Sequence, residues 1–398
     1  MDITISPGIL SGTVNAIPSK SIAHRMLICA ALAYTPTQIV CHGTSSDIDA
    51  TVRCLEALGA NIHATTEGFE VIPIRSLPAV ATLPCGESGS TLRFLLPIVG
   101  ALGVRASFHM EGRLSQRPLS PLWEEMERMG CHLEFQDTDI LQCNGKLRPG
   151  NYRIPGNVSS QFISGLLLAL PLLEENSTLD IIGPLESKPY VDLTLAAMDA
   201  FGIHAQLPTI PGKQRYCTRG RIEVEGDWSN AAFWITAGAL NNPVSIVGLT
   251  PDSLQGDQAV MDILPLMNHH AIISAAQIPD LIPILAVFGA VNAGAVFTDI
   301  RRLRLKESDR VAAICAMINA LGGKATATEN TLTIHGTGLK GGIINSCRDH
   351  RIAMAAAIAS TLCIQPVTIL DAECVNKSYP GFWDDFTRLG GKYEFYLR

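Results

Sequence analysis

The stretch SKSIAHRMLICAALA, residues 19–33, opens with polar residues and continues as a run of small apolar ones. A serine just before an apolar run is typical of a capped helix start, so the stretch predicts a helix that is buried after its first turn. The same pattern recurs along the chain, which indicates an internal repeat. The five further copies are SGSTLRFLLPIVGAL at 88–102, SSQFISGLLLALPLL at 159–173, WSNAAFWITAGAL at 228–240, PDLIPILAVFGAV at 279–291 and DHRIAMAAAIAS at 349–360.

The copies are spaced with a period of about seventy residues. The successive separations are 69, 71, 69, 51 and 69 residues, counted between Lys20, Gly89, Ser160, Ser229, Asp280 and Asp349. About forty residues after each marker a helical pattern ends and a strand-like run follows. Five of these places have glycine where a helix end favours left-handed backbone, and the fourth has Asn268. We therefore expect six α/β units, each of strands and two helices, with a shortened fourth unit.

The short fourth unit suggests where the chain changes domain. Three units before it and three from it onward predict two similar domains, with crossings near residues 12 to 18 and 225 to 229. We expect residues 1–14 with 228–398 to form one domain and residues 15–227 the other. A helix start offers unpaired N–H groups and about half a positive charge. Six helix starts facing a common hollow would therefore suit phosphates and carboxylates.

Composition excludes several classes of protein. The 398 residues are 47% hydrophobic and 17% charged, with a formal charge of −7 and a pI near 5.8, which argues against nucleic-acid or anionic-membrane partners. The eleven cysteines form no CxxC pair, which predicts reduced thiols and no zinc site. The first residues lack the regions of a signal peptide, and the apolar stretch 281–297 is interrupted by a proline and an asparagine. We expect a cytoplasmic protein in which that stretch is a buried helix.

The helix starts carry several basic and hydroxyl residues. Apolar positions from Ile22 onward, at spacings of four, three and four, predict a buried stripe that leaves Lys20, Ser21 and Arg25 outside it. Ser21 and Arg25 share a helix face that suits one anionic group, although a capped surface helix is an equal alternative. The glycine-rich stretch before the second helix fits an anion-binding nest, while Arg93 lies inside that helix and is expected to be structural.

The segment RRLRLKESDR, residues 301–310, has a local net charge of +3. Its alternating leucines predict a strand end with Arg302, Arg304 and Lys306 on one face, and an exposed ion-paired segment is the alternative. Asp280 precedes a long apolar run, and a helix N-cap would explain it without any catalytic role.

Nine short motifs occur in one order along the chain: PSKSxxxR, GxSGSTLRF, RP at 117–118, SSQF, SKPY, IPD, RLKESDR, DHR and NKSYP. In content and order they resemble the 5-enolpyruvylshikimate-3-phosphate synthase family over nearly the full length. The resemblance implies an α/β (α+β) fold of two similar domains. Each would hold three βαβαββ-like units in an inside-out barrel, with the active site in the interdomain cleft.

The resemblance also implies an activity and its residues. The enolpyruvyl group of phosphoenolpyruvate would move to the 5-hydroxyl of shikimate 3-phosphate, on the route to chorismate and the aromatic amino acids. The implied shikimate 3-phosphate contacts are Lys20, Ser21, Arg25, Ser159, Ser160, Gln161, Ser187, Tyr190, Asp280 and Lys306. The implied phosphoenolpyruvate contacts are Lys20, Gly89, Arg117, Gln161, Arg310, Arg351 and Lys377. No cofactor, metal, nucleic acid or membrane is implied, and a monomer is expected.

Such a reaction needs both an acid and a base. Asp280 is similar in position to the family's group that contacts the substrate hydroxyl, and is a candidate base. Glu307, with Lys20 or Lys306, is the candidate for moving the proton to and from the methylene carbon, and the assignment stays open. Packed cations are expected to keep Glu307 ionised and to lower the pKa of a neighbouring lysine.

The chain departs from the family pattern at three residues, and three other functions are alternatives to the one that the resemblance implies. Ser90 and Phe94 stand where many relatives carry Thr and Pro, and Arg302 where some carry Asn. The first two lie on the helix that shapes the phosphoenolpyruvate pocket in the family, so the sequence makes no prediction for or against sensitivity to glyphosate. The sister transferase that acts on UDP-N-acetylglucosamine has Lys-Asn at 20–21 and a cysteine before its Arg-Pro, and this chain has neither. A catalytically silent anion binder would not need Asp280 and Glu307. An RNA-end-processing enzyme would want a basic surface and a nucleophilic histidine motif.

Overall fold

The computed structural model describes residues 1–396 of the chain, which divides into two compact units. Unit 1 comprises Met1–Ile17 with the chain from Gly226 onward, and unit 2 comprises Pro18–Glu225. The crossings thus lie at 17/18 and 225/226 rather than at 14/15 and 227/228. The first crossing is later because strand β2 (Gly12–Asn15) pairs with β14 (Val244–Val247) of unit 1 and keeps those residues there.

Unit 2 contains three sheets with strand orders β13-β3-β5-β4, β6-β7-β9-β8 and β10-β11-β12. Each sheet contains one parallel pair, β13 with β3, β6 with β7 and β10 with β11. The strands are β3 (Thr37–Val40), β4 (Asn61–Thr65), β5 (Gly68–Ile72), β6 (Val80–Gly86), β7 (Arg105–Met110), β8 (Cys131–Asp137), β9 (Ile140–Gly145), β10 (Asn151–Pro155), β11 (Ser177–Ile182), β12 (Thr209–Ile210) and β13 (Arg221–Glu223).

The helices of unit 2 alternate with these strands. They are α1 (Lys20–Ala31), α2 (Ser46–Ala57), α3 (Gly89–Leu102), α4 (Leu122–Arg128), α5 (Ser160–Ala169) and α6 (Lys188–Ala200), with 3-10 turns η1 (Leu114–Gln116) and η2 (Leu170–Leu172). Parallel strands joined by a buried helix are the expected solution for this alternation of strand and helix patterns.

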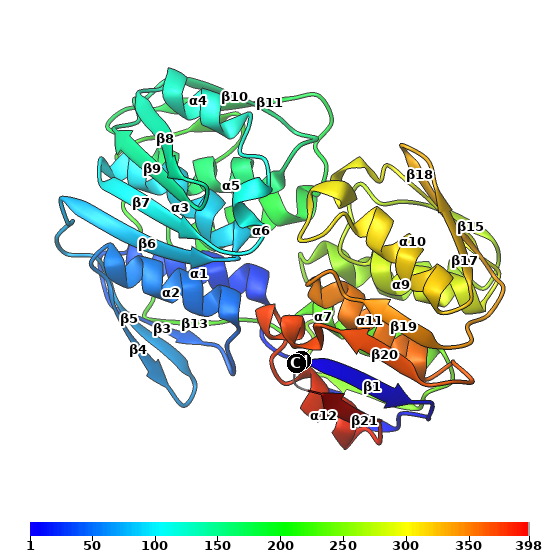
Figure 1. Cartoon of the computed structure of the whole chain (residues 1–398). Helices are drawn as coiled ribbons and strands as arrows, with labels where there is room; N and C mark the ends of the chain where they lie inside the picture. The colour runs from blue at the N-terminus through cyan, green and yellow to red at the C-terminus, as the bar shows by residue number, and fades with distance from the viewer. Residues whose placement is uncertain (397–398) are drawn as a thin grey trace. The chain divides into compact units, whose positions relative to one another are not determined.

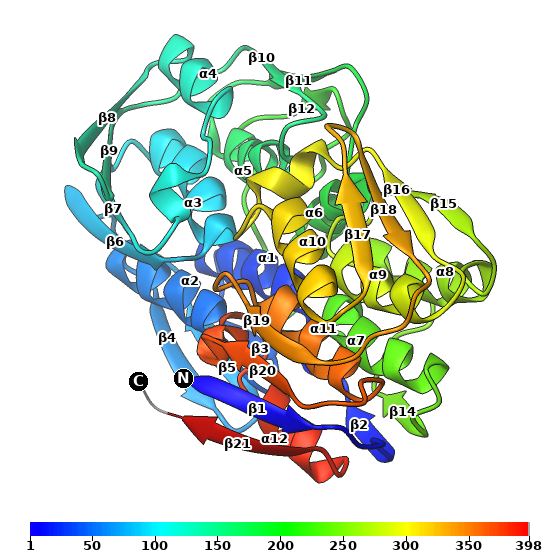
Figure 2. The same cartoon turned by 45° about the vertical axis from the view of Figure 1, so that its right-hand side comes forward.

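Unit 1 repeats the same pattern in sheets β15-β16-β18-β17 and β19-β20-β1-β21, and in the pair β14-β2. Its other strands are β1 (Asp2–Ser6), β15 (Ala271–Ser274), β16 (Ala295–Thr298), β17 (Lys324–Ala327), β18 (Thr331–His335), β19 (Gly342–Asn345), β20 (Val367–Leu370) and β21 (Lys392–Tyr396). Its helices are α7 (Trp228–Ala239), α8 (Val260–Leu266), α9 (Ile282–Val291), α10 (Arg310–Ala320), α11 (His350–Ser360) and α12 (Phe382–Arg388), with η3 (Gly256–Ala259), η4 (Arg301–Leu305) and η5 (Ala372–Lys377). The N-terminal strand β1 lies between β20 and β21 (Figures 1 and 2).

The short fourth repeat has a simple structural basis. Within residues 1–396, strand β14 pairs with β2 alone, and α8 is followed directly by β15 of the next sheet, whereas α2, α4 and α10 are each followed by a two-stranded hairpin. This missing hairpin accounts for the 51-residue spacing between Ser229 and Asp280.

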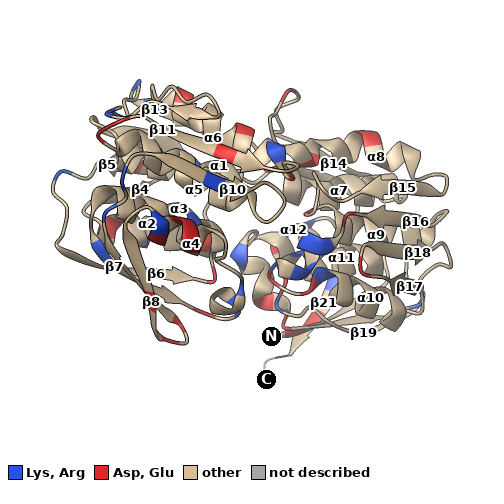
Figure 3. Ribbon diagram, turned by 90° about the horizontal axis from the view of Figure 1, so that it is seen from above, with Lys and Arg blue, Asp and Glu red and all other residues tan. Residues whose placement is uncertain are grey.

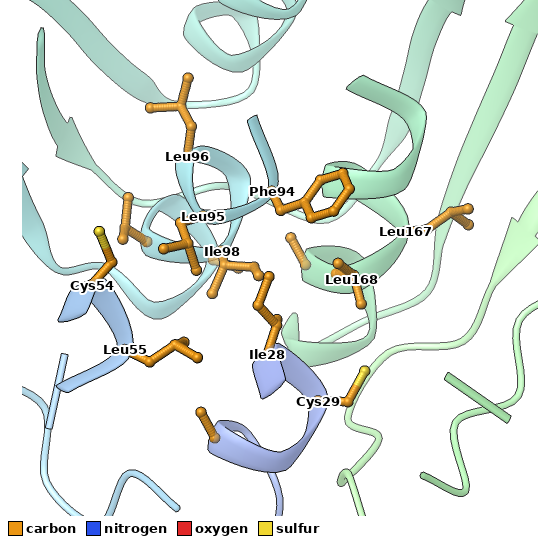
Figure 4. Close-up of a cluster of buried hydrophobic side chains, with 14 of the residues drawn as sticks. Ile28, Cys29, Cys54, Leu55, Phe94, Leu95, Leu96, Ile98, Leu167 and Leu168 are labelled. Atoms are coloured by element: carbon orange, nitrogen blue, oxygen red, sulfur yellow. The ribbon is translucent and has the colours of Figure 1, made fainter. Parts of the chain in front are cut away.

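Buried helices form the core of unit 2. In α3, 12 of the 14 residues are buried. Figure 4 shows Leu95 and Ile98 of α3 near Ile28 of α1, Leu55 of α2 and Leu168 of α5. Burial of each such side chain contributes about 1.5–3 kcal/mol, so this contact of four helices fixes where their first turns lie.

Helix α1 differs from the predicted amphipathic pattern. Nine of its twelve residues are buried, including His24 and Arg25, while Met26 on the predicted stripe is only partly buried. The prediction that Arg25 lies off the buried surface is therefore wrong. The apolar spacing could not show that α1 is covered on several sides, because α2, α3 and α6 all pack against it.

Helix ends follow the sequence in five repeats of six. Glycine takes a positive φ at each of the five predicted positions, Gly59, Gly130, Gly202, Gly322 and Gly390. Asn268 is not among the described non-glycine residues with positive φ, so the predicted left-handed cap there is wrong. Helix α9 is buried at nine of ten positions, as expected. Within residues 1–396, no helix has the length and apolar character needed to cross a bilayer.

The basic segment at 301–310 is not a strand. Residues Arg301–Leu305 form the 3-10 helix η4, in which Leu303 is buried and Leu305 is 42% exposed. The predicted face of Arg302, Arg304 and Lys306 is therefore wrong, because alternation over so few residues does not distinguish a strand from a 3-10 turn.

Candidate active site

The predicted site residues fall into two groups, one in each unit. The helix-start cluster of unit 2 comprises Lys20, Ser21, Arg25, Gly89, Arg117, Ser159, Ser160, Gln161, Ser187 and Tyr190. The Asp280 cluster of unit 1 comprises the predicted residues Asp280, Lys306, Glu307, Arg310 and Arg351 with their partner Asp349, and the predicted Lys377 lies elsewhere in the same unit. Lys and Arg (blue) and Asp and Glu (red) take up a small part of the ribbon in Figure 3, as expected for a chain in which 17% of the residues are charged.

Arg25 is a buried cation without a carboxylate partner among residues 1–396. Its Nε donates to Thr194 Oγ1 at 2.7 Å, Nη1 to the Ser21 carbonyl at 2.6 Å, and Nη2 to the Tyr190 carbonyl at 2.8 Å. A longer bond joins Nη2 to Ser164 Oγ at 3.3 Å. Burial lowers the pKa of Arg25 to about 10. A buried guanidinium bonded only to neutral groups keeps an uncompensated positive charge, which favours a bound anion.

Lys20 begins α1 and is held by a residue that the sequence did not single out. Its Nζ lies 2.8 Å from Asp47 Oδ2 in the first turn of α2, and the side chains are 15% and 7% exposed. A ligand phosphate would therefore compete with Asp47 for this ammonium group. No sequence signal separated Asp47 from the other acidic residues of helix first turns.

Gly89 is packed against two guanidinium groups at the start of α3. A Cβ at this position would lie 2.7 Å from Arg117 Nη1 and 2.8 Å from Arg93 Nη1. The absence of a side chain thus lets both arginines approach the first turn of a helix, where the backbone N–H groups favour anions. Ser88 caps this helix by accepting from the Thr91 N–H at 3.3 Å.

Gln161 links α5 to α3 through both ends of its amide. Its Oε1 accepts from Arg93 Nη1 at 2.8 Å, and its Nε2 donates to Ser90 Oγ at 3.0 Å. Arg93 also donates to the Pro118 carbonyl at 3.2 Å. Arg93 therefore has the structural role expected from the sequence, and it joins Gly89, Gln161 and the Arg117–Pro118 loop.

The remaining hydroxyl residues of unit 2 lie at helix starts. Ser159 caps α5 by accepting from the Gln161 N–H at 3.3 Å, and Ser160 is buried beside it. Ser187 precedes α6 in the left-handed region at φ 53°, and the carbonyl of Tyr190 in the next turn contacts Arg25. The hydroxyls that bond Arg25 itself are those of Thr194 and Ser164, inside α6 and α5.

Asp280 is not the N-cap of α9, since the cap is Leu281. Instead its Oδ1 lies 2.5 Å from Arg310 Nη1 and 3.4 Å from Lys306 Nζ, and its Oδ2 lies 3.4 Å from Arg351 Nη2. The expectation that a cap explains Asp280 is therefore wrong. Burial alone would raise its pKa, but Arg351, Lys306 and Arg310 overcome that effect and hold the pKa well below its ordinary value.

Arg310 is surrounded by three carboxylates. Its Nη1 bonds Asp280, its Nη2 lies 2.7 Å from Glu307 Oε2, and its Nε lies 2.8 Å from Asp349 Oδ2. The side chain is 1% exposed, and despite the cost of burial its pKa is raised well above the ordinary value by Asp349, Glu307 and Asp280. A ligand carboxylate would have to displace one of these partners to reach Arg310.

Lys306 has a lowered pKa. Burial lowers its pKa to about 8, assisted by Arg310 and Arg302 and opposed by Asp280 and Glu307. The predicted lowering of a lysine pKa by its surroundings is correct. Burial contributes more to it than the neighbouring cations on which the prediction was based.

Arg351 and Lys377 lie on neighbouring elements of unit 1. Asp349 caps α11 by accepting from the Arg351 N–H at 3.0 Å, and Arg351 Nη1 reaches the carbonyls of Ser229 and Asp280 at 3.5 Å each. Lys377 is buried at the end of η5, which packs against α11. The start of α11 is thus tied to the starts of α7 and α9.

One further acidic residue belongs near this cluster. Asp257 in η3 is 2% exposed, accepts a hydrogen bond from Ser229 Oγ, and its Oδ1 has no hydrogen-bond partner. Burial, with help from the charge of Asp280, raises the pKa of Asp257 to about 6. A single aspartate after a glycine carries no sequence signal for such a role. Among residues 1–396, no group of His, Cys, Asp or Glu is arranged to hold a metal ion.

The chain is similar to known proteins in sequence and in fold. The family model for EPSP synthase (3-phosphoshikimate 1-carboxyvinyltransferase) matches residues 5–386. The 3-phosphoshikimate 1-carboxyvinyltransferase of Clostridium kluyveri is 40% identical over 416 residues, covering 98% of this chain and 97% of that protein. The protein of the same name from Clostridium beijerinckii is 40% identical over 428 residues, covering 99% and 98%.

A solved structure shares the fold. The EPSP synthase of Acinetobacter baumannii superposes with a TM-score of 0.81 at 22% sequence identity, covering 99% of this chain and 100% of that one. The two-unit α/β architecture is therefore that of a known fold. Together with the match of nearly the whole chain, it follows that this chain belongs to the EPSP synthase (3-phosphoshikimate 1-carboxyvinyltransferase) family.

Proposed function

We propose that the chain transfers the enolpyruvyl group of phosphoenolpyruvate to the 5-hydroxyl of shikimate 3-phosphate and releases inorganic phosphate. The observation that carries the proposal is the part-buried pair of Asp280, an ionised carboxylate, and Lys306, whose pKa is about 8 and whose Nζ lies 3.4 Å from Asp280 Oδ1. Such a pair supplies a proton acceptor and a proton donor near neutral pH, in a chain that belongs to this family.

The reaction must move protons in both directions. The hydroxyl oxygen bonds to the central carbon of phosphoenolpyruvate, the hydroxyl loses its proton, and the methylene carbon gains one. The tetrahedral product then breaks its carbon–oxygen bond to phosphate, and the methyl group returns a proton to restore the double bond. Each step therefore needs a group that can change its protonation state next to the substrates.

We assign Asp280 to the hydroxyl and Lys306 with Glu307 to the methylene carbon. Asp280 is a weak base because its pKa is low, so it accepts the proton only as the new carbon–oxygen bond forms. Lys306 has a pKa close to the working pH, which suits both donation and recovery of a proton. Glu307 Oε2 accepts a hydrogen bond from Arg310 Nη2. Glu307 is the second carboxylate, after Asp280, that acts on the pKa of Lys306.

We assign acceptor binding to the helix-start cluster. Arg25 and Lys20 would neutralise the anionic groups of shikimate 3-phosphate, and its other proposed contacts are Ser21, Ser159, Ser160, Gln161, Ser187 and Tyr190, with Asp280 and Lys306 from unit 1. The support is the buried charge of Arg25, whose hydrogen bonds within residues 1–396 go to hydroxyl and carbonyl oxygens. Arginine suits a planar carboxylate, and lysine with helix N–H groups suits phosphate.

We assign phosphoenolpyruvate binding to residues of both clusters. Gly89, with Arg117 against it, offers a helix start and a cation for the phosphate. Arg310 and Arg351 would bind the carboxylate in place of their present carboxylate partners. The other proposed contacts are Lys20, Gln161 and Lys377.

One assay tests the proposal. The protein is incubated with phosphoenolpyruvate and either shikimate 3-phosphate or UDP-N-acetylglucosamine, and inorganic phosphate is measured. Phosphate release with shikimate 3-phosphate alone is expected. Release with the sugar nucleotide alone would reassign the acceptor, and release with neither would indicate an anion binder without this activity.

We also propose that the enzyme works in the cytoplasm as a monomer. All eleven cysteines are free thiols, and seven of them are buried, which suits a reducing compartment. Light scattering coupled to size-exclusion chromatography tests the oligomeric state, with a mass of 42.7 kDa expected.

A further inference from the structure

Phe94 lies beside the uncompensated cation of unit 2. It is on the second turn of α3 and 1% exposed, and its ring centroid is 4.8 Å from Arg25 Cζ. Figure 4 shows the Phe94 ring directed from α3 toward the helix that carries Leu167 and Leu168. The same helix, α5, supplies Ser164 to Arg25. The aromatic ring thus belongs to the set of groups that enclose this guanidinium.

The hydrogen bonds of Arg25 are made by the nitrogens at the edge of its guanidinium group. Thr194, Ser164 and two backbone carbonyls accept hydrogen bonds from its nitrogens, and these acceptors come from α1, α5 and α6. None of them is ionised, so none cancels the positive charge. A ring lying near the guanidinium attracts that charge through its quadrupole without neutralising it, and this attraction is strongest where water is excluded.

We propose that Phe94 is a positioning residue for the acceptor, because its ring holds Arg25 in place while leaving the guanidinium charge available to an anion. A carboxylate in place of the ring would neutralise that charge, as Asp47 neutralises the charge of Lys20. An aliphatic side chain would fill the space without attracting the cation. This inference rests on the proposed function, since it assigns Arg25 to the anionic acceptor.

The inference distinguishes the two substrates. Arg25 is the residue in contact with the ring, whereas Gly89, Arg93 and Arg117 form a separate set of contacts at the first turn of α3. Loss of the ring should therefore weaken acceptor binding and leave phosphoenolpyruvate binding unchanged. A residue that only fills the core would instead lower stability and change both KM values together.

The experiment compares three kinds of substitution in the full chain. Phe94→Leu removes the ring, and mono-, di- and trifluorophenylalanine at position 94 keep its shape while weakening its quadrupole step by step. Phe108→Leu is the matched control, because Phe108 is fully buried in the same core and no Lys or Arg among residues 1–396 lies over its ring. For each protein, kcat, both KM values and the dissociation constant for shikimate 3-phosphate by calorimetry are measured.

The expected result is a rise in KM and dissociation constant for shikimate 3-phosphate of about 5- to 30-fold in Phe94→Leu. The fluorinated series should show graded increases, with kcat and the KM for phosphoenolpyruvate within about twofold. Phe108→Leu should change neither KM. Unchanged acceptor affinity across the fluorinated series would overturn the inference, and that series remains informative if Phe94→Leu does not fold.

Failure of the proposed function would be seen separately, in the wild-type chain. If that chain binds shikimate 3-phosphate without turning it over, the calorimetric comparison still tests the ring. If it does not bind this acceptor, both the acceptor assignment and the role of Phe94 are overturned.

Discussion

Arg310 Nη1 lies 2.5 Å from Asp280 Oδ1, and the same carboxylate is 3.4 Å from Lys306 Nζ. Two cations thus share one acceptor oxygen, and a third, Arg351, contacts the other oxygen at 3.4 Å. Removing the charge of Asp280 would leave these cations facing one another with fewer carboxylates to balance them. The charge of Asp280 and the pKa of Lys306 are consequently linked.

Asp280→Asn is expected to lower turnover by about 10²- to 10⁴-fold, because the proton acceptor for the hydroxyl is lost. The charge of Asp280 raises the pKa of Lys306, so its removal should lower that pKa further below about 8. The alkaline limb of residual kcat/KM should therefore move to lower pH, as measured from pH 5 to 10. Asp252→Asn, at an exposed position of unit 1, is the control and should match wild type. An unshifted alkaline limb in Asp280→Asn would mean that Lys306 does not control it.

Lys20→Met should abolish turnover and also reduce stability. The substitution leaves the Asp47 carboxylate, only 7% exposed, without its ion-pair partner, which costs about 1–3 kcal/mol of unfolding free energy. The double variant Lys20→Met/Asp47→Asn should recover most of that stability and remain inactive. Urea unfolding and phosphate release measure the two effects. Turnover that returned with stability in the double variant would show that Lys20 only supports the fold.

Gly89→Ala should raise the KM for phosphoenolpyruvate by about 10- to 100-fold with little change in melting temperature. The new methyl group would lie under 3 Å from nitrogens of Arg117 and Arg93, and these flexible side chains would move rather than the helix. Gly381→Ala is the control, since nothing lies within 4 Å of a Cβ there. A large loss of stability with an unchanged KM would contradict this role for the glycine.

The raised pKa of Asp257 leads us to expect that the free energy of unfolding depends on pH. Its pKa is raised from 3.8 to about 6 in the folded chain, so the folded state binds its proton more tightly than the unfolded state. Between about pH 4 and 6 the wild type should therefore lose stability as pH rises, on the order of 2–3 kcal/mol from this group.

Asp257→Asn removes that loss, so its stability relative to wild type should increase from pH 4 to pH 7 in urea unfolding. Asp262→Asn, exposed on the neighbouring helix α8, should show no such pH-dependent difference. Parallel stability curves for Asp257→Asn and wild type would exclude the raised pKa.

The repeat made much of the fold predictable. Helices α1, α3 and α5 begin at Lys20, Gly89 and Ser160, which are the residues used as sequence markers, because polar caps followed by apolar runs are a strong local signal. The glycines at helix ends were equally informative, since only glycine takes a positive φ at no steric cost. Both signals are local in the chain.

Pairing between distant residues was not predictable in the same way. The sequence did not indicate that Asp280 bonds three cations rather than capping α9, nor that Asp47 holds Lys20. It placed Arg25 on an open helix face, although three other helices cover α1. Such contacts depend on tertiary packing, and the family resemblance could name the residues without giving their partners.

The position of β1 between β20 and β21 has a consequence for synthesis on the ribosome. Unit 2 is one continuous segment and can assemble as soon as residue 225 has left the exit tunnel. Strand β1 precedes unit 2 in the chain, whereas both of its neighbours, β20 and β21, follow unit 2. The backbone hydrogen bonds of β1 can therefore form only after unit 2 and most of unit 1 have been translated, so the sheet that contains β1 is completed late.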